Sequence, residues 1–170
     1  MNYILVADKQ EADNIKIPPE LEQTTEIIVL GIGCPATLRT LAKLFLNKKF
    51  NHGDRFFNIG YVGSNEYPIG TVVNVGVAAA EQNSKHFPCP EYTLDTTSNV
   101  KCYSSFDFVE SSEHTGIFDM ELYTLASLFP TIKSVKIVSD NLNFHDWKSV
   151  DISDAWKIAN SMLFKIISEQ

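Results

Sequence analysis

Several short apolar runs, in which polar and apolar residues do not alternate, constrain the fold more than any other feature of the sequence. Residues 3–7 (YILVA), 26–33 (EIIVLGIG) and 135–138 (VKIV) are runs of this kind. A strand with one face in water alternates polar and apolar residues, whereas a strand that is apolar throughout is covered on both faces. Helical patterns lie between the runs. Together they predict an α/β fold: a three-layer α-β-α sandwich with a central mixed sheet.

Periodicity locates the other elements. In residues 34–49 (CPATLRTLAKLFLNKK), Pro35 suits a first helical turn, and Leu38, Leu41 and Phe45 form an apolar stripe. This pattern predicts an amphipathic helix. The other predicted helices span residues 119–129 and 151–169, the other predicted strands lie at 54–63, 69–81 and within 101–111, and a loop is predicted at 82–99.

Length and composition fit a single domain over residues 1–170. The chain is 44% hydrophobic and 21% charged, which is enough apolar material for one core. The formal net charge of −7 and the absence of a basic stripe argue against a nucleic-acid partner. No apolar run is long enough to span a membrane, and the first residues lack the pattern of a signal peptide. Three cysteines in no metal-like spacing suit free thiols, so we expect a cytoplasmic protein.

Carboxylates in apolar surroundings are the strongest chemical signals. Glu121 shares the predicted helical face of Leu125 and Leu128. Burying an unpaired carboxylate on such a face costs on the order of 3 kcal/mol or more. Glu121 is therefore either paired with a lysine or with water at the helix end, or it is functional. We assign Asp119 to capping of the helix. Asp140 directly follows a buried strand, where it is either a turn residue or a site residue.

Other motifs give weaker signals. Glu11, in DKQEAD after the first strand, is by pattern alone a solvated loop charge. The turn GIGCPAT could present backbone N–H groups to an anion, but it lacks the lysine and the glycine spacing of a phosphate loop. The four histidines are dispersed, so no metal site is predicted, and no motif indicates a cofactor.

Taken in order, several fragments match a known pattern. These are ADKQEA after the first strand, GIG opening a helix, NIGYVGS followed by YPIGTVV, SSFDFVE, FDMELYTLA and VSDN. On these motifs the chain resembles the nucleoside phosphorylase/nucleosidase superfamily, and most closely its 5′-methylthioadenosine/S-adenosylhomocysteine nucleosidase branch. The resemblance implies a shortened phosphorylase/hydrolase-like fold, a nucleoside as the small-molecule partner and a homo-oligomer, a dimer or larger.

The resemblance also implies roles in cleavage of a purine nucleoside to free base and sugar. Asp140 would be the general acid that protonates purine N7, oriented by Ser139. Glu11 would activate the attacking water. Glu121 would hold the ribose 2′- and 3′-hydroxyls, with Met120 packed against the sugar. For this reaction Asp140 must be protonated near neutral pH, so we expect a partly desolvated pocket.

The remaining implied site residues bind the base or shape the pocket. Phe108 would stack on the base and the backbone of Val109 would read its edge. Gly33, in the GIG turn, completes the substrate-binding set. Tyr61 stands where a small residue is usual in the family, and we expect its ring to fill part of the pocket.

Two alternatives to hydrolysis remain open. A phosphate-dependent nucleoside phosphorylase needs cationic donors for phosphate, and the chain has only two arginines. Arg39 is predicted to lie too far along its helix to face the site, and Arg55 to lie at the wrong end of its strand. Hydrolysis is therefore favoured. A nucleoside-binding protein with weak or no catalysis is the other alternative.

Overall fold

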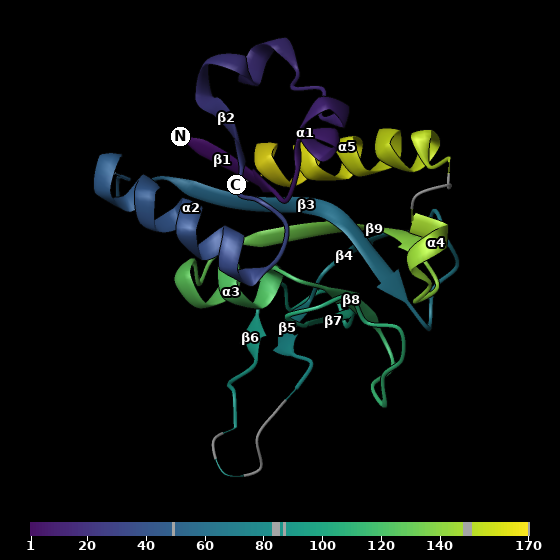
Figure 1. Cartoon of the computed structure of the whole chain (residues 1–170). Coiled ribbons are helices and arrows are strands. Elements are labelled where there is room, and N and C mark those ends of the chain that lie inside the picture. Colours follow the sequence, from purple (N-terminus) through teal and green to yellow (C-terminus); the bar gives the residue numbers. More distant parts are fainter. Residues whose placement is uncertain (49, 83–85, 87, 148–150, 170) are drawn as a thin grey trace.

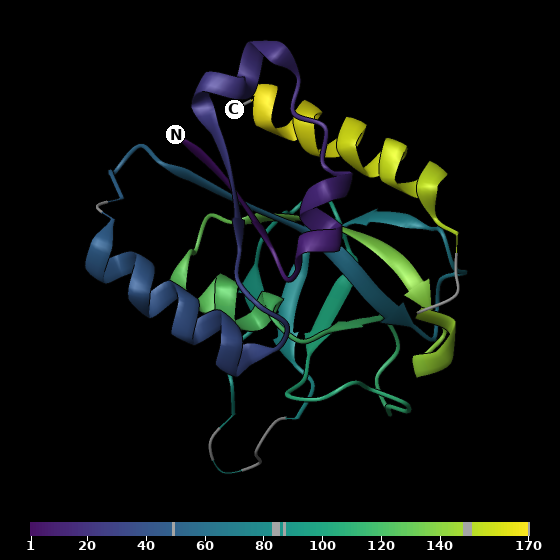
Figure 2. The same ribbon diagram turned by 45° about the horizontal axis from the view of Figure 1, so that its top comes forward.

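The computed structural model describes residues 1–48, 50–82, 86, 88–147 and 151–169. Within these residues the strands form one mixed sheet between two layers of helices (Figures 1 and 2). The strands are β1 (Asn2–Val6), β2 (Thr25–Val29), β3 (Arg55–Ser64), β4 (Val72–Asn74), β5 (Val77–Ala80), β6 (Tyr92–Thr93), β7 (Lys101–Ser104), β8 (Ile117–Asp119) and β9 (Lys133–Asp140). The helices are α1 (Lys9–Asn14), the 3₁₀ helix η1 (Pro19–Thr24), α2 (Cys34–Asn47), α3 (Leu122–Leu128), α4 (Phe144–Trp147) and α5 (Ser153–Ser168).

The long strand β3 joins the two halves of the sheet. It pairs in parallel with β1 and with β9, and β1 pairs in parallel with β2. The last residues of β3, Gly63 and Ser64, pair antiparallel with β8. Strands β8, β7 and β5 then run parallel to one another, while β6 and β4 are antiparallel additions to β5 and β9. The ends of β1, β8 and β9 therefore converge near the last residues of β3.

Each face of the sheet carries its own apolar core. Helix α5 covers one face with Trp156, Ala159 and Leu163, against Ile4 and Phe57 of the sheet. Helices α2 and α3 cover part of the other face, where the core includes Leu41, Leu122, Leu125 and Phe129. The two helix layers lie on opposite sides of the sheet in Figure 1. The predicted three-layer sandwich with a mixed sheet is confirmed.

Several predicted boundaries are wrong for local reasons. Residues 69–81 form two strands, β4 and β5, because the chain turns at Gly76, where a Cβ atom would lie 2.0 Å from the carbonyl oxygen of Ser98. The predicted loop at 82–99 contains β6, and α1 and α4 were not predicted. Helix α3 begins at Leu122 and not at Asp119, because Asp119 still pairs with Ser104 of β7.

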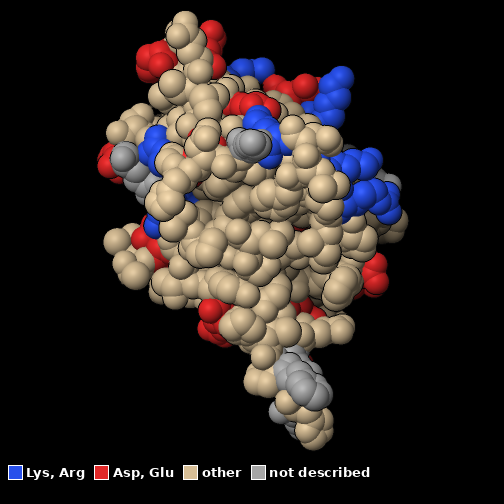
Figure 3. Space-filling model, turned by 90° about the vertical axis from the view of Figure 1, so that its left-hand side faces the viewer, with Lys and Arg blue, Asp and Glu red and all other residues tan. Residues whose placement is uncertain are grey.

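The apolar stripe predicted on α2 is only partly buried. Leu41 lies in the core, whereas Leu38, Phe45 and Leu46 are exposed by 45%, 48% and 85%. Figure 3 shows the side of the molecule on which α2 ends, and charged side chains lie mostly around the rim of this face. No helix within the described residues is long and apolar enough to cross a membrane.

Candidate active site

A cavity of about 650 Å³ lies where the ends of β1, β8 and β9 converge near the last residues of β3. Its walls come from the end of β1 and the start of α1, the β2–α2 turn, β3, the loop after β7, the end of β8 and the end of β9. This is the edge of the sheet at which α/β proteins commonly bind ligands. All nine residues predicted for the site line the cavity: Glu11, Gly33, Tyr61, Phe108, Val109, Met120, Glu121, Ser139 and Asp140.

Glu11 is buried, with 4% of its surface exposed, so the expectation of a solvated loop charge from pattern alone is wrong. It is the N3 residue of a capping box that begins with Asp8 at the N-terminus of α1. Its Oε2 accepts the backbone N–H of Ala7 at 2.7 Å, and its Oε1 accepts that of Tyr61 at 2.9 Å. Burial raises the pKa of Glu11, although these hydrogen bonds and the charge of Lys136 oppose the increase.

Glu121 is buried at the N-terminus of α3, with 8% of its surface exposed. It precedes the first helical residue, so the prediction that it shares a helical face with Leu125 and Leu128 is wrong. Its Oε1 accepts the backbone N–H of Gly33 at 2.6 Å, which links α3 to the turn before α2. Burial, together with the charge of Asp119, raises the pKa of Glu121 to about 7.

Asp119 forms a buried ion pair that the sequence analysis did not anticipate. Its Oδ2 lies 2.8 Å from Nζ of Lys136, a residue of β9, and both side chains are 1–2% exposed. The same oxygen accepts the backbone N–H of Leu122 at 3.1 Å, which confirms that Asp119 caps the helix. Its Oδ1 accepts the hydroxyl of Ser104 at 2.5 Å. The neighbouring carboxylates raise the pKa of Lys136, against the opposing effect of its own burial.

Asp140 ends β9 and is 1% exposed. The hydroxyl of Ser139 lies 2.9 Å from its Oδ2, and the backbone N–H of Leu142 donates to its Oδ1 at 2.9 Å. Leu142 has a φ of 61°, in the left-handed region that non-glycine residues rarely adopt. Such strain is often found where the structure fixes a functional group. At Leu142 this conformation points the backbone N–H toward the carboxyl group of Asp140.

Aromatic side chains form another part of the cavity wall. Phe108 packs edge-on against Phe144 of α4, with 5.3 Å between ring centroids, and both line the cavity. The ring of Tyr61 packs edge-on against Trp156, and its hydroxyl accepts the indole N–H at 2.8 Å. Tyr61 therefore forms a wall held by α5, and the cavity beside it stays open.

Arg39 lines the cavity from α2, so the prediction that it lies too far along its helix is wrong. Pro35 and Ala36, about one turn earlier on the same helix face, also contribute to the wall. The helix thus passes along the cavity. Arg55, by contrast, is not among the lining residues, as expected, and its Nε donates to the side chain of Asn2.

Several residues that shape the site were not predicted from the sequence. Lys136 was visible as the single charge in VKIV, and a lysine in a buried strand requires a buried partner. Leu142 and Phe144 gave no comparable signal, since their roles depend on the approach of distant segments. No group of three or more His, Cys, Asp or Glu side chains suitable for a metal ion occurs within the described residues.

No protein-family model matches the sequence, and no curated protein matches it. Solved structures do match. The Chlamydia trachomatis nucleosidase (MTAN) bound to MTA gives a TM-score of 0.73 at 16% identity, over 99% of this chain and 97% of that chain. The 5′-methylthioadenosine/S-adenosylhomocysteine nucleosidase of Neisseria meningitidis with methylthio-immucillin-A gives a TM-score of 0.71 at 14% identity, over 99% of both chains. The futalosine hydrolase of Helicobacter pylori gives a TM-score of 0.73 at 13% identity, over 99% of this chain and 97% of that chain.

The chain has the fold of these nucleosidases. The match extends over nearly the whole of each chain, so the fold implied by the sequence resemblance is confirmed. At 13–16% identity the similarity establishes the fold alone, and the chemistry has to be argued from the cavity.

Proposed function

We propose that this chain hydrolyses the N-glycosidic bond of a purine nucleoside, of the methylthioadenosine or adenosylhomocysteine type, to the free base and the sugar. One observation carries the proposal. Three buried carboxyl groups from distant segments, those of Glu11, Glu121 and Asp140, line one cavity. The solved structures bound to MTA and to methylthio-immucillin-A support a nucleoside as the ligand of this fold.

In the proposed reaction Glu121 holds the sugar. Its Oε1 accepts the Gly33 amide, whereas its Oε2 accepts no hydrogen bond from the described residues and can therefore accept hydrogen bonds from the ribose hydroxyls. Met120 packs against the sugar ring. Hydroxyl donation favours the ionised carboxylate, so binding of the nucleoside shifts Glu121 toward its charged form.

Departure of the base is assisted by Asp140. As the bond between the sugar C1′ and the purine nitrogen breaks, negative charge develops on the base, and a proton from Asp140 neutralises it at N7. A well-placed general acid typically contributes about 10²–10⁴-fold. Ser139 and the Leu142 amide orient the carboxyl group. Phe108 stacks on the base, and the backbone of Val109 reads its edge.

Glu11 supplies the base for the attacking water. Water forms the new bond to C1′ and gives its proton to Glu11, while the negative charge of Glu11 stabilises the cationic sugar. Each oxygen of Glu11 accepts backbone N–H groups, but Oε1 has only that of Tyr61 and keeps a second lone pair for water. The hydrogen bonds thus fix the carboxylate without occupying it fully.

Incubation with methylthioadenosine, adenosylhomocysteine, adenosine and inosine, with and without phosphate, tests the proposal. We expect phosphate-independent release of free base, and loss of about 10²-fold or more of kcat in Asp140→Asn. Asp13→Asn makes the same change at an exposed residue of α1 outside the cavity and serves as the control. Full turnover by Asp140→Asn contradicts the general-acid role.

Phosphorolysis is the second candidate, and the position of Arg39 in the cavity wall is the observation that favours it. Release that requires phosphate, with sugar 1-phosphate as product, identifies this reaction. Thermal stabilisation by a nucleoside without turnover identifies a binding protein instead.

Self-association is a further part of the proposed function. Leu38, Phe45 and Leu46 leave apolar surface exposed on α2, and covering such surface favours association. Sedimentation velocity at micromolar concentration tests it: we expect a dimer or larger species, and a monomer contradicts the proposal.

A further inference from the structure

Arg39 is a basic residue in the wall of a cavity that is otherwise lined, among charged residues that the structure describes, by acidic ones. Within the described residues no carboxylate oxygen lies within 4.0 Å of it, whereas Lys48, Lys101 and Lys136 all have such partners. Arg39 is the only basic residue among the described residues that line the cavity. Six acidic residues line it as well: Asp8, Glu11, Asp107, Asp119, Glu121 and Asp140.

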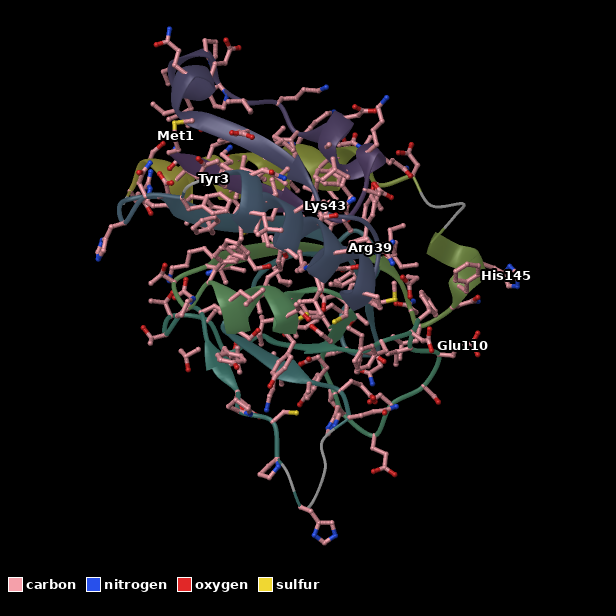
Figure 4. All side chains as sticks on the ribbon, turned by 60° about the vertical axis from the view of Figure 1, so that its left-hand side comes forward. Met1, Tyr3, Arg39, Lys43, Glu110 and His145 are labelled. Atoms are coloured by element: carbon pink, nitrogen blue, oxygen red, sulfur yellow. The ribbon has the colours of Figure 1, made fainter. Side chains whose placement is uncertain are left out.

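The position of Arg39 along α2 relates it to the sugar site. The helix starts beside Gly33, whose amide is bound to Glu121, and Arg39 follows six residues later. At a rise of about 1.5 Å per residue, Arg39 lies about 9 Å farther along the helix axis. In the view of Figure 4, Arg39 lies nearer than Lys43 to the segments that carry Glu110 and His145, which are next to the lining residues Val109 and Phe144.

This arrangement leaves a place for the substituent of a nucleoside. With its hydroxyls on Glu121 and its base toward Asp140, a sugar has its 5′ end free to extend along α2. A substituent of four to six bonds covers most of the distance of about 9 Å from Gly33 to Arg39, and the long side chain of Arg39 covers the rest. A guanidinium at that distance matches a carboxylate or a phosphate group, which it binds through two parallel hydrogen bonds.

We propose that Arg39 binds an anionic oxygen group, a carboxylate or a phosphate, carried at the 5′ end of the nucleoside, and that it makes this chain prefer such substrates to neutral ones. The inference rests on the proposed function, whose substrate class it narrows. It concerns specificity: Arg39 acts on the far end of the substrate and takes no part in bond cleavage.

Two substrates with carbon chains of the same length test the inference. These are 5′-deoxyadenosine with a 3-carboxypropylthio group and with a butylthio group at the 5′ carbon, so that a terminal carboxylate in one replaces a terminal methyl group in the other. We expect kcat/KM to be about fivefold higher for the carboxylate, mostly through KM, since a charge pair at this exposed position contributes at most about 1 kcal/mol. In Arg39→Gln the ratio of the two kcat/KM values falls to about one. Arg39→Lys keeps the positive charge but loses the planar guanidinium that donates two parallel hydrogen bonds, so we expect an intermediate ratio.

Lys43→Gln is the matched control. Lys43 lies one turn farther along α2, is exposed like Arg39, carries the same charge and does not line the cavity. We expect this variant to keep the wild-type ratio. Equal ratios in the wild type, Arg39→Gln and Lys43→Gln overturn the inference. If the ratio falls as far in Lys43→Gln as in Arg39→Gln, the inference is also overturned, because the preference then comes from the overall positive charge of the helix and not from contact with Arg39.

Arg39 could also bind free phosphate instead of an anionic group on the nucleoside, and a separate experiment distinguishes these two ligands. If phosphate accelerates release of base from the butylthio substrate and Arg39→Gln loses this acceleration, Arg39 binds phosphate as a co-substrate, and the substituent assignment is wrong. If neither nucleoside is cleaved, the proposed hydrolysis fails, and calorimetric titration of both nucleosides then decides the inference. Tighter binding of the carboxylate that is lost in Arg39→Gln supports it, and equal or undetectable binding overturns it.

Discussion

A Cβ atom at Gly60 would lie 2.6 Å from Oε1 of Glu11. Gly60 belongs to β3 and does not have the positive φ that favours glycine, so its backbone conformation would accept alanine. The glycine is therefore required by the approach of the carboxylate. Gly63, three residues later, stands in the same relation to Asp140, since a Cβ there would lie 2.7 Å from its Oδ1. Two glycines of one strand make room for the two proposed catalytic groups.

Gly60→Ala tests the first of these relationships. The added methyl group displaces the Glu11 carboxylate from its bond to the Tyr61 amide, and we expect kcat/KM for nucleoside hydrolysis to fall by about 100-fold. Overpacking lowers the free energy of unfolding by about 1–3 kcal/mol, so the protein stays folded at room temperature. Steady-state kinetics and urea unfolding measure the two effects.

Gly53→Ala provides the comparison for Gly60→Ala. A Cβ at Gly53 meets no atom within 4 Å, and its φ is also outside the left-handed region. Activity and stability of this variant should match the wild type. Full activity in Gly60→Ala would mean that the position of Glu11 is unimportant for turnover, which contradicts its role as the base.

Lys136→Met tests the buried ion pair. Removing the ammonium group leaves Asp119 charged and buried, and breaking a buried pair from one side typically costs about 3–5 kcal/mol. We expect a loss of this size in the free energy of unfolding from urea denaturation. Lys136→Arg keeps the charge and should recover part of it. Lys157→Met removes a lysine whose pair with Asp154 is fully exposed, and should leave stability essentially unchanged.

Asp119→Asn in the Lys136→Met background tests whether the unpaired charge causes this loss. If the loss in the single variant comes from the unpaired charge, neutralising Asp119 returns part of the lost stability, because asparagine can still accept the Leu122 amide. A double variant that is less stable than Lys136→Met would show that packing of the lysine, and not its charge, is what matters.

The layers of the fold could be predicted from the sequence because they depend on local patterns. The apolar runs at β1, β2 and β9 and the periodicity of α5 are visible without tertiary information, and the three-layer sandwich follows from them. The break between β4 and β5 could not be predicted in this way, since it depends on the carbonyl of Ser98 approaching Gly76. Helix α1 was missed because six residues are too few to show a period.

The candidate site could be assembled from the sequence only through the family resemblance. Pattern alone assigned Glu11 to solvent, and nothing in DKQEAD indicates that β3 brings the Tyr61 amide to its carboxylate. The misplacement of Arg39 has a simpler cause. Arg39 is predicted to lie too far along its helix to face the site, but the helix passes along the cavity, so a residue in its second turn still reaches the wall.

The raised pKa of Glu121 makes both stability and binding depend on pH. Its folded value of about 7 lies above the ordinary value of 4.5, so between these two pH values the folded protein binds more protons than the unfolded chain. Stability contributed by the protonated group is then complete below pH 4.5 and is lost as the pH rises through 7. This difference in pKa corresponds to a contribution on the order of 3 kcal/mol to stability.

Glu121→Gln should therefore be more stable than the wild type at pH 8, and the difference should shrink toward pH 4.5. The same variant loses the hydroxyl acceptor, so we expect nucleoside affinity to fall at least tenfold at pH 8, where the wild-type carboxylate is ionised and binds best. Thermal unfolding and calorimetric titration across this pH range measure the two effects together. Glu22→Gln, an exposed change in η1, controls for net charge. A wild-type affinity that is constant from pH 5.5 to 8, or a Glu121→Gln variant that keeps it, contradicts the assignment of Glu121 to the sugar.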